Sequence, residues 1–412
     1  MENVVGDSIP RAAYVHIPFC RRRCYYCDFP ISVLGDKTTS GTFASIEHYV
    51  EILCLEIEIT PVFGVSIDTV FFGGGTPSLL PVAQLERILD TIERHFGITT
   101  GAEISMEMDP GTFTLEQLQG YKNAGVNRVS LGVQAFQDQL LQVCGRSHSS
   151  NDIFTAIDLI RQVGISNLSL DLISGLPHQT LAQWQSSLEE AIKISPHHIS
   201  CYDLVLEPVT VFGKKYQPGD SPLPTDEVTV QMYQLAQQIL TSAGYEHYEI
   251  SNYAHKGYQC RHNRVYWQNK PYYGFGMGAA SYTQRQRFTR PRIRVQYYAW
   301  VKQLIEAKGV IDFPQNTNKD ILLETLMLGL RLAEGIQLSQ IRQQFGEETL
   351  TKIWACLQSY EQQNWVEVLG KDEKRVKMED AETLPAVGRL RLTDPEGFLF
   401  SNTILAALFN LF

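Results

Sequence analysis

The chain has 412 residues, 44% of them hydrophobic, with 35 basic and 45 acidic residues and a formal net charge of -10. This length and hydrophobic content allow a large buried core and suggest two or three domains. The acidic balance excludes general nucleic-acid binding, which requires a strongly basic surface.

The N-terminal segment lacks the apolar core of a signal peptide, and no run of about 18 apolar residues could span a membrane. Eight cysteines are present, and those outside one cluster form no regular disulfide framework. The scattered cysteines are Cys54, Cys144, Cys201, Cys260 and Cys356. We therefore expect a cytoplasmic protein in a reducing compartment.

The first predicted strand, Ala13–His16, leads into a loop in which Cys20, Cys24 and Cys27 form a Cys-x3-Cys-x2-Cys pattern. Three thiolates this close together can hold three irons of an iron–sulfur cube and leave the fourth iron open. A zinc knuckle is the alternative, but structural zinc sites use four ligands and no matching Cys or His pair follows. The pattern favours a [4Fe-4S] cluster.

Short apolar runs then alternate with amphipathic helical stretches over the first half of the chain. The predicted strands are Ala13–His16, Thr69–Gly73, Glu103–Glu107, Arg128–Val133, Asn167–Asp171 and Ile199–Leu204. The predicted helices are Ile46–Thr60, Ala83–His95, Leu115–Ala124, Asn151–Val163 and Leu181–Ile194. Repeated strand–helix units predict an α/β fold with a parallel sheet, and six units predict a partial barrel instead of a closed eight-unit barrel.

Glycine and polar residues follow the ends of these strands, where barrels of this kind carry their functional groups. These candidates are Gly73, Gly74, Gly75, Thr76, Glu107, Gln134, Arg146 and Asp171. Glycines let the backbone approach a ligand closely, and a charge that ends an apolar strand needs a partner. That partner is either a ligand or a structural ion pair. Tyr14 and Tyr26 flank the cysteines, either against a cofactor or as core filler.

The pattern changes after Leu206. The Pro- and Gly-rich stretch Glu207–Asp226 predicts a connecting loop, and a helix is predicted at Val228–Ala243. An aromatic and Gly-rich stretch, Tyr258–Tyr282, precedes the basic segment Arg285–Arg294. That segment either binds anionic groups or is a solvated charge run.

From about Asn316 the chain is predicted to be mainly helical. The predicted elements are helices at Asp320–Arg331, Leu338–Phe345 and Leu350–Gln363, a strand pair at Trp365–Leu369 and Lys374–Met378, and a last helical run. Helices followed by a small hairpin suggest a winged-helix-like module. We expect three parts: residues 1–206, 207–315 and 316–412.

The motifs also resemble those of a known family. Tyr14-Val-His-Ile-Pro-Phe-Cys20 with the cysteine triad, Gly73-Gly-Gly-Thr-Pro77, Leu-Gly-Val-Gln134 and Cys-Gly-Arg146-Ser-His occur in the order found in the radical SAM coproporphyrinogen dehydrogenase family. The resemblance covers nearly the whole chain. With His262-Asn263-Arg-Val-Tyr266-Trp267 included, the chain is most similar to the heme-chaperone branch of that family, HemW.

The resemblance implies a [4Fe-4S] cluster on the three cysteines and S-adenosylmethionine on the open iron. It implies that the strand-end candidates, with Tyr14 and Tyr26, bind this cofactor, and that His262 contacts heme. The decarboxylating members carry a further Cys two residues after the third, where this chain has Phe29. Phe29 therefore favours a heme chaperone over an oxygen-independent coproporphyrinogen III dehydrogenase.

The implied partners are heme-accepting proteins, some of them at the membrane surface, and a small electron carrier. Arg21–Arg23 in the cysteine loop would dock an acidic carrier, or else form a solvated loop. The basic segment Arg285–Arg294 would pair with heme propionates. A homodimer is compatible with the sequence.

Overall fold

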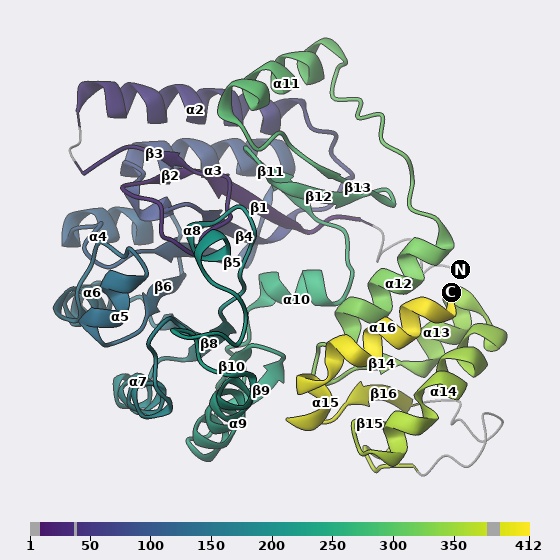
Figure 1. The fold of residues 1–412 in the computed structure, drawn as a ribbon. Coiled ribbons are helices and arrows are strands. Elements are labelled where there is room, and N and C mark those ends of the chain that lie inside the picture. The colour runs from purple at the N-terminus through teal and green to yellow at the C-terminus, as the bar shows by residue number, and fades with distance from the viewer. Residues whose placement is uncertain (1–8, 37–38, 377–387) are drawn as a thin grey trace.

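The computed structural model describes residues 9–36, 39–376 and 388–412. Its centre is a curved sheet whose strands follow one another in the order β1, β4, β5, β6, β7 and β8, all parallel (Figure 1). Their bounds are β1 Ala12–Ile17, β4 Ile67–Gly74, β5 Ile98–Met108, β6 Arg128–Gln134, β7 Asn167–Ser174 and β8 His198–Asp203. The predicted α/β fold with a six-strand partial barrel is confirmed.

Three short strands extend this sheet at its two edges. β11 (Tyr273–Phe275) pairs in parallel with β1, and β10 (Asn252–Ala254) and β9 (Glu246–Glu249) add antiparallel strands beyond β8. The sequence analysis did not predict this pairing, because strands of three or four residues carry too little periodicity to be recognised. The later part of the chain therefore completes both edges of the barrel.

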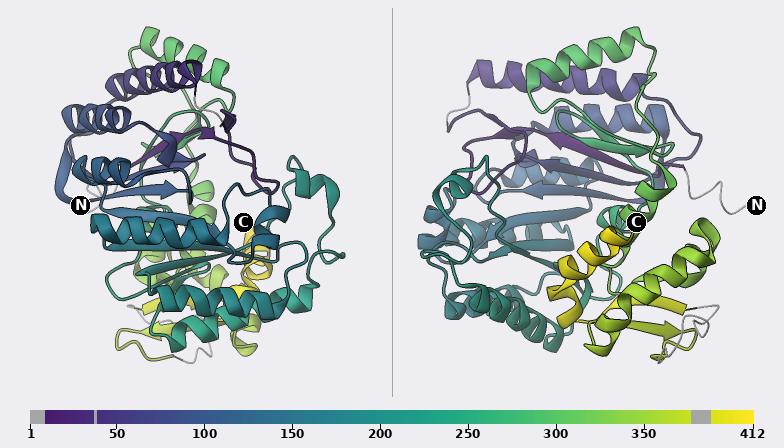
Figure 2. Two further views of the ribbon diagram at one scale, coloured as in Figure 1. Left: turned by 90° about the vertical axis from the view of Figure 1, so that its left-hand side faces the viewer. Right: turned by 45° about the vertical axis from the view of Figure 1, so that its right-hand side comes forward.

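Helices cover the outer face of the sheet (Figure 2). They are α2 Ser40–Ile59, α3 Val82–Phe96, α4 Leu115–Asn123, α5 Asp138–Val143, α6 Ser150–Val163, α7 Leu181–Ile194 and α9 Asp226–Ser242. Contacts join α2 to α3, α3 to α4, α4 to α6 and α7 to α9. Thr39, Thr114, Ser149 and Thr180 begin four of these helices with capping boxes. Each such cap stabilises its helix by about 1 kcal/mol. The short α5 was not predicted.

The predicted loop after β8 contains one short helix, α8 (Val211–Lys215). The aromatic region then supplies α10 (Arg261–Trp267), the hairpin of β12 (Ala280–Thr283) and β13 (Gln286–Thr289), and α11 (Arg294–Glu306). α11 lies along α2 at the top of Figure 1. The loop that carries the cysteines is joined at its base by β2 (Phe19–Cys20) and β3 (Ser32–Val33).

The C-terminal part has its own hydrophobic core, which runs from Leu322 to Leu408, whereas the main core runs from Ala13 to Val301. Its elements are α12 Asn318–Gly329, β14 Ile336–Gln337, α13 Leu338–Phe345, α14 Glu347–Gln362, β15 Val366–Gly370, β16 Gly388–Leu392, α15 Glu396–Leu399 and α16 Ser401–Leu411. The predicted C-terminal helices are confirmed.

The predicted pairing of Trp365–Leu369 with Lys374–Met378 is present as far as the structure describes it. Arg375 forms a bridge to Leu369, Val376 N donates to Val368 O at 2.8 Å, and Gly370 N donates to Lys374 O at 2.8 Å. Lys377 and Met378 lie outside the described residues. On its other edge β15 pairs along its length with β16, a strand that was not predicted, whose alternate residues Leu390 and Leu392 are buried in the core.

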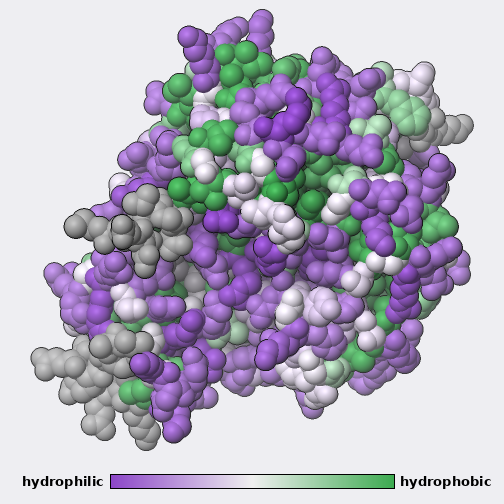
Figure 3. All heavy atoms as spheres, turned by 180° about the vertical axis from the view of Figure 1, so that it is seen from behind, coloured by the Kyte–Doolittle hydropathy of each residue, from purple (hydrophilic) through white to green (hydrophobic). Residues whose placement is uncertain are grey.

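Seen from behind, the molecular surface is mostly hydrophilic, with hydrophobic side chains gathered in its upper half (Figure 3). Within the described ranges, no helix has the length and apolar character needed to cross a membrane.

Candidate functional site

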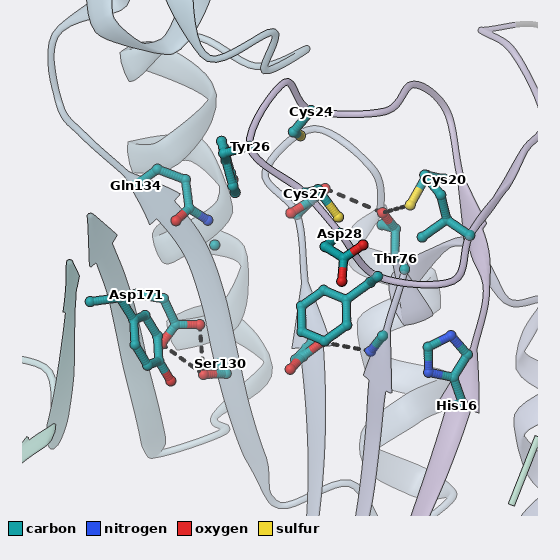
Figure 4. A pocket seen from close by; sticks show the side chains of 18 of the residues that line it. His16, Cys20, Cys24, Tyr26, Cys27, Asp28, Thr76, Ser130, Gln134 and Asp171 are labelled. Atoms are coloured by element: carbon teal, nitrogen blue, oxygen red, sulfur yellow. Dashed lines mark hydrogen bonds between the residues drawn. The ribbon is translucent and has the colours of Figure 1, made fainter. Parts of the chain in front are cut away.

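A cavity of about 900 Å³ lies between the carboxyl ends of the parallel strands and the cysteine loop. It continues along the inner face of the sheet as far as Arg128, at the start of β6. The structure brings together, around this cavity, every predicted site residue except Gly73 and His262. Those that line it are Tyr14, Cys20, Cys24, Tyr26, Cys27, Gly74, Gly75, Thr76, Glu107, Gln134, Arg146 and Asp171. Figure 4 labels the three cysteines, Tyr26, Thr76, Gln134 and Asp171 among them.

The three cysteines come from one loop above the strand ends, and all three are free thiols (Figure 4). The Thr76 hydroxyl lies 3.6 Å from Cys20 Sγ, and Arg146 Nη1 lies 3.6 Å from Cys24 Sγ. Burial raises the pKa of Cys20 to about 12 and also raises the pKa of Cys27. Three free thiols on one loop beside one cavity are the type of donor that an iron–sulfur cluster uses.

The glycine run at the end of β4 holds the cysteine loop in place. Gly75 N donates to Ile17 O at 2.8 Å, and Thr76 N donates to Phe19 O at 2.7 Å. A Cβ on Gly75 would come within 2.8 Å of the Ile17 carbonyl oxygen, so a side chain there would push the loop away. The glycines are thus required by this close approach of two backbones.

Glu107, at the end of β5, accepts a hydrogen bond from Gly74 N at 2.9 Å. Gly74 has a φ of 110°, and a Cβ there would collide with the His16 ring. Burial, with a smaller contribution from the nearby Asp171 and Asp109, raises the pKa of Glu107 to about 8, although the hydrogen bond from Gly74 lowers it. The Glu107 carboxyl is therefore mostly protonated at neutral pH and can both donate and accept hydrogen bonds. Gly73 lies beside it but outside the cavity.

Arg146 joins the cysteine loop to the ends of two strands, β5 and β6. Its Nη2 donates to Asp109 Oδ1 at 2.5 Å and to Gly132 O at 2.9 Å, and the Tyr26 hydroxyl lies 3.5 Å from Nη1. The Arg146 side chain is 7% exposed, so this ion pair is largely protected from water. The sequence analysis missed Asp109, although its position two residues after Glu107, beyond the end of β5, was a usable signal.

Asp171, on β7, accepts hydrogen bonds from Ser130 Oγ at 2.9 and 3.0 Å and from Ser169 Oγ at 3.3 Å (Figure 4). Burial raises the pKa of Asp171, while these serines and Ser200 lower it. Gln134 ends β6 with a φ of 66°, which directs the chain sharply away from the sheet. Its side chain faces the same cavity (Figure 4).

Aromatic residues form one wall of the cavity. Tyr14 stacks on Phe71 at a centroid distance of 6.3 Å, and its hydroxyl lies 3.0 Å from His16 Nδ1. His16 Nε2 is 2.8 Å from Pro30 O, and burial lowers the His16 pKa to about 4. Tyr266 and Tyr272 continue the wall toward the deep end of the cavity.

His262, on α10, lies behind this wall and does not line the cavity. Its Nδ1 is 2.8 Å from Thr69 Oγ1, its Nε2 is 2.8 Å from Tyr266 Oη, and its ring stacks on Phe71. Burial lowers the His262 pKa to about 3, so the ring is neutral. Both ring nitrogens are engaged by the protein, and the predicted heme contact would require at least one of these bonds to break.

The arginines of the basic segments Arg285–Arg294 and Arg21–Arg23 mostly form ion pairs and hydrogen bonds within the protein. In the later one, Arg287 pairs with Glu324, Arg290 pairs with the fully buried Glu56, and Arg292 pairs with Asp28 at the cavity. In the cysteine loop, Arg22 pairs with Asp36, Arg21 donates to Gly111 O, and Arg23 donates to the carbonyls of Cys27 and Phe29. These arginines mainly fix the loops that surround the cavity.

The chain matches two described protein domains. The radical SAM superfamily matches residues 14–191, and the HemN C-terminal domain matches residues 316–372. The heme chaperone HemW of Synechocystis sp. is 51% identical over 403 residues, which cover 97% of each chain. The chain belongs to the HemW family. HemW of Bacillus subtilis is 36% identical over 341 residues, covering 82% of this chain and 87% of that protein.

The fold of this HemW-family chain is also that of a solved enzyme. Coproporphyrinogen III oxidase (HemN) from Escherichia coli, a radical SAM enzyme, superposes with a TM-score of 0.77 and 22% identity. The match covers 98% of this chain and 91% of the enzyme. At this identity the likeness establishes the shared fold and no more.

Arg128 is another cavity residue of this HemW-family chain that the sequence did not single out. Arg128, Ser130, Gly132 and Gln134 all line the cavity, since alternate residues of a strand face the same side. The signal that could have found Arg128 is its charge at the start of an otherwise apolar strand, in phase with Gln134.

Proposed function

We propose that this chain is a heme chaperone that holds a [4Fe-4S] cluster on Cys20, Cys24 and Cys27, binds S-adenosylmethionine at the strand ends, and delivers heme to hemoproteins. The observation that carries the proposal is the 51% identity to a heme chaperone along 97% of both chains. The cavity adds independent support, because its three free thiols share one space with the strand-end polar groups.

A bound cluster supplies one electron to a bound sulfonium cofactor, and the protein positions both. Thr76 and Arg146 place hydrogen-bond donors beside the sulfurs of Cys20 and Cys24, which favours their thiolate forms. The protonated Glu107 can donate to a ligand oxygen beside the glycine run. Asp171 and Gln134 offer acceptors and donors for the hydroxyl and amino groups of a nucleoside.

The aromatic wall suits a flat, apolar macrocycle, which Tyr14, Phe71, Tyr266 and Tyr272 can cover by stacking and edge contacts. We propose that His262 contributes to heme binding by fixing the Tyr266 hydroxyl, which it contacts at 2.8 Å. Replacing His262 with Ala would then weaken heme uptake. Unchanged uptake would remove His262 from the site.

Phe29 is the residue that distinguishes the chaperone proposal from the decarboxylase alternative. It lines the mouth of the cavity, is 59% exposed, and stands where decarboxylating enzymes of the resembled family carry a fourth cysteine. A phenylalanine offers an apolar contact to a ligand at this mouth and no thiol. Oxidative decarboxylation of coproporphyrinogen III is therefore the outcome that we expect the assays to exclude.

We propose a cytoplasmic protein that meets heme-accepting proteins, some of them at the membrane surface, and a small electron carrier. Residues 1–206 would bind the cofactors, residues 207–315 would complete the heme cavity, and residues 316–412 would form a separate module with its own core. Sedimentation of the cluster-loaded chain would decide whether it works as a homodimer.

The test is a pair of assays on one anaerobically reconstituted preparation. We expect the protein to take up heme with a change in the Soret absorption, and to leave coproporphyrinogen III unconverted in the presence of S-adenosylmethionine and a reductant. Conversion to protoporphyrinogen IX without heme uptake would replace the proposal with the dehydrogenase. A Phe29→Cys variant is the control for whether one thiol at this mouth changes the outcome.

A further inference from the structure

The deep end of the cavity contains a buried cation that forms no direct ion pair with any of the described residues. Arg128 is 1% exposed and is one of the residues that line the cavity, at the start of β6. Its Nε has no hydrogen-bond partner, and no described residue forms a hydrogen bond or an ion pair with the Arg128 side chain. A buried charge without a partner costs several kcal/mol, so a group is missing from this position.

The nearby carboxylates do not fill this role, because each is committed elsewhere. Glu103 accepts hydrogen bonds from the backbone N–H groups of Arg261 and His262, at 3.2 and 3.1 Å, at the start of α10. Asp171 accepts from Ser130 and Ser169. Both carboxylates act on Arg128 only at a distance, and their charges help keep it protonated. The guanidinium nitrogens therefore remain available to a ligand.

The position of Arg128 separates it from the cysteine loop. It precedes Gln134 by six residues along β6, which corresponds to about 20 Å at about 3.3 Å per residue. The other buried cavity arginine, Arg146, lies near the loop and is already bound to Asp109. A ligand held at Arg128 therefore lies at the end of the cavity opposite the cysteine loop.

The surroundings of Arg128 indicate the chemistry of that ligand. Across the cavity, α10 closes the deep end with Asn263 and Tyr266, and Tyr272 lies beside them. An aromatic wall facing one unpaired guanidinium suits a large, flat, apolar molecule that carries a carboxylate. Arginine binds a carboxylate through two parallel hydrogen bonds, which fixes orientation as well as affinity.

We propose that Arg128 binds a propionate carboxylate of the tetrapyrrole and so sets the orientation in which the macrocycle enters the cavity. This inference rests on the proposed function and names the group that anchors the ligand within it. The same carboxylate chemistry occurs in the methionine part of S-adenosylmethionine, but that group is expected beside the cysteine loop, at the opposite end of β6.

The test compares protoporphyrin IX with its dimethyl ester, both free of metal, on the full cluster-reconstituted chain. Removing the iron eliminates axial ligation, so the difference between acid and ester reports the carboxylates alone. We expect the wild type to bind the acid about 10- to 100-fold more tightly than the ester, as for other charge-assisted hydrogen bonds.

In Arg128→Gln, binding of the acid should weaken by about the same factor while binding of the ester stays unchanged. Arg128→Lys should keep part of the preference, because a lysine retains the charge but not the paired donors. Arg94→Gln is the matched control, since Arg94 is 69% exposed on the outer helix α3. Circular dichroism would establish that each variant is folded. The comparison of acid and ester binding by the wild type remains a test even if a variant fails to fold.

Equal binding of acid and ester by the wild type would overturn the inference while leaving the chaperone proposal intact. An equal loss of acid and ester binding in Arg128→Gln would also overturn it, because a general change of the cavity would then explain the result. A loss of S-adenosylmethionine binding with unchanged porphyrin binding would assign Arg128 to the cofactor instead. A wild type that binds no porphyrin, and takes up no heme, would contradict the proposed function itself.

Discussion

Two arginines in this chain are almost completely buried, and their surroundings differ. Arg290 lies between α2 and α11, where its Nε is 2.7 Å from Glu56 Oε1 and its Nη1 donates to Ser281. Glu56 also accepts from Gly276 N and the Tyr297 hydroxyl, so every charge there has a protein partner. Arg128 is buried to the same degree but faces a cavity alone.

The difference separates a structural charge from one kept for a ligand. A buried pair such as Arg290 and Glu56 joins distant parts of the chain, here α2 and the segment before α11. A buried charge without an ion-pair partner, such as Arg128, does not stabilise the ligand-free fold in this way. A ligand that supplies the opposite charge would bind more tightly because of it. The predictions below test this distinction and the cluster site that lies at the other end of the cavity.

The largest expected effect is at the cysteine loop. Reconstituted wild-type protein should contain about four irons per chain, and Cys24→Ala should contain close to none, because two thiolates cannot hold the cube stably. Iron analysis and the visible absorption of the cluster measure this. Cys356→Ala, in α14 of the C-terminal part, is the control and should keep its iron. Unchanged iron in Cys24→Ala would contradict the cluster assignment.

The next effect concerns the paired arginine. Arg290→Gln leaves the Glu56 carboxylate buried without its cation, which should lower the free energy of unfolding by about 3–5 kcal/mol. Urea unfolding followed by circular dichroism measures the loss. Arg22→Gln, which breaks an exposed pair with Asp36, should leave the free energy of unfolding nearly unchanged and serves as the control. Similar costs for both variants would show that burial of the pair is not what matters.

A smaller effect concerns the protonation of Glu107. The folded protein binds this proton up to a pKa of about 8, whereas an unfolded Glu releases it near 4.5, so the folded state holds more protons between these values. Stability therefore falls as pH rises through this window, by at most about 1.4 kcal/mol per pH unit from this group.

The cleanest range for this measurement is about pH 6.5 to 8, because buried neutral histidines such as His16 affect stability only below the ordinary histidine pKa of about 6.5. In ligand-free protein, Glu107→Gln should be less sensitive to pH in this range than the wild type. Parallel stability curves for the two proteins would show that Glu107 is ionised in the folded state.

The smallest expected effect is on the stability of ligand-free Arg128→Gln. Replacing Arg128 leaves no ion-pair partner buried without its counter-charge. The free energy of unfolding of Arg128→Gln should therefore differ from that of the wild type by less than about 1 kcal/mol, or be higher. The contrast with Arg290→Gln, measured under the same conditions, sharpens the distinction between the two arginines. A loss as large as that of Arg290→Gln would mean that Arg128 is a structural charge after all.

Much of the fold and the site could be predicted because the signals were local. The strands β1 and β4 to β8 each carry an apolar run of their own, and the strand-end residues, from the cysteines to Asp171, follow these runs directly. Glu107 was predicted to need a partner, and Gly74 supplies one.

The rest depended on contacts between segments far apart in the chain. β11 is three residues long and is defined by its pairing with β1, more than 250 residues away. The burial of His262 between Thr69 and Tyr266, and the lack of a partner for Arg128, depend on how α10 packs against β4 and β5. No local pattern in the sequence encodes that packing.

The central claim is that heme passes through this chain to an acceptor, and the most direct test is the rate of that transfer. Heme-loaded protein is mixed with an apo-hemoprotein, and the Soret change is compared with heme loss to a passive scavenger. We predict that transfer to the acceptor depends on acceptor concentration and exceeds the passive release rate. A transfer rate equal to passive release at every acceptor concentration would contradict the chaperone function.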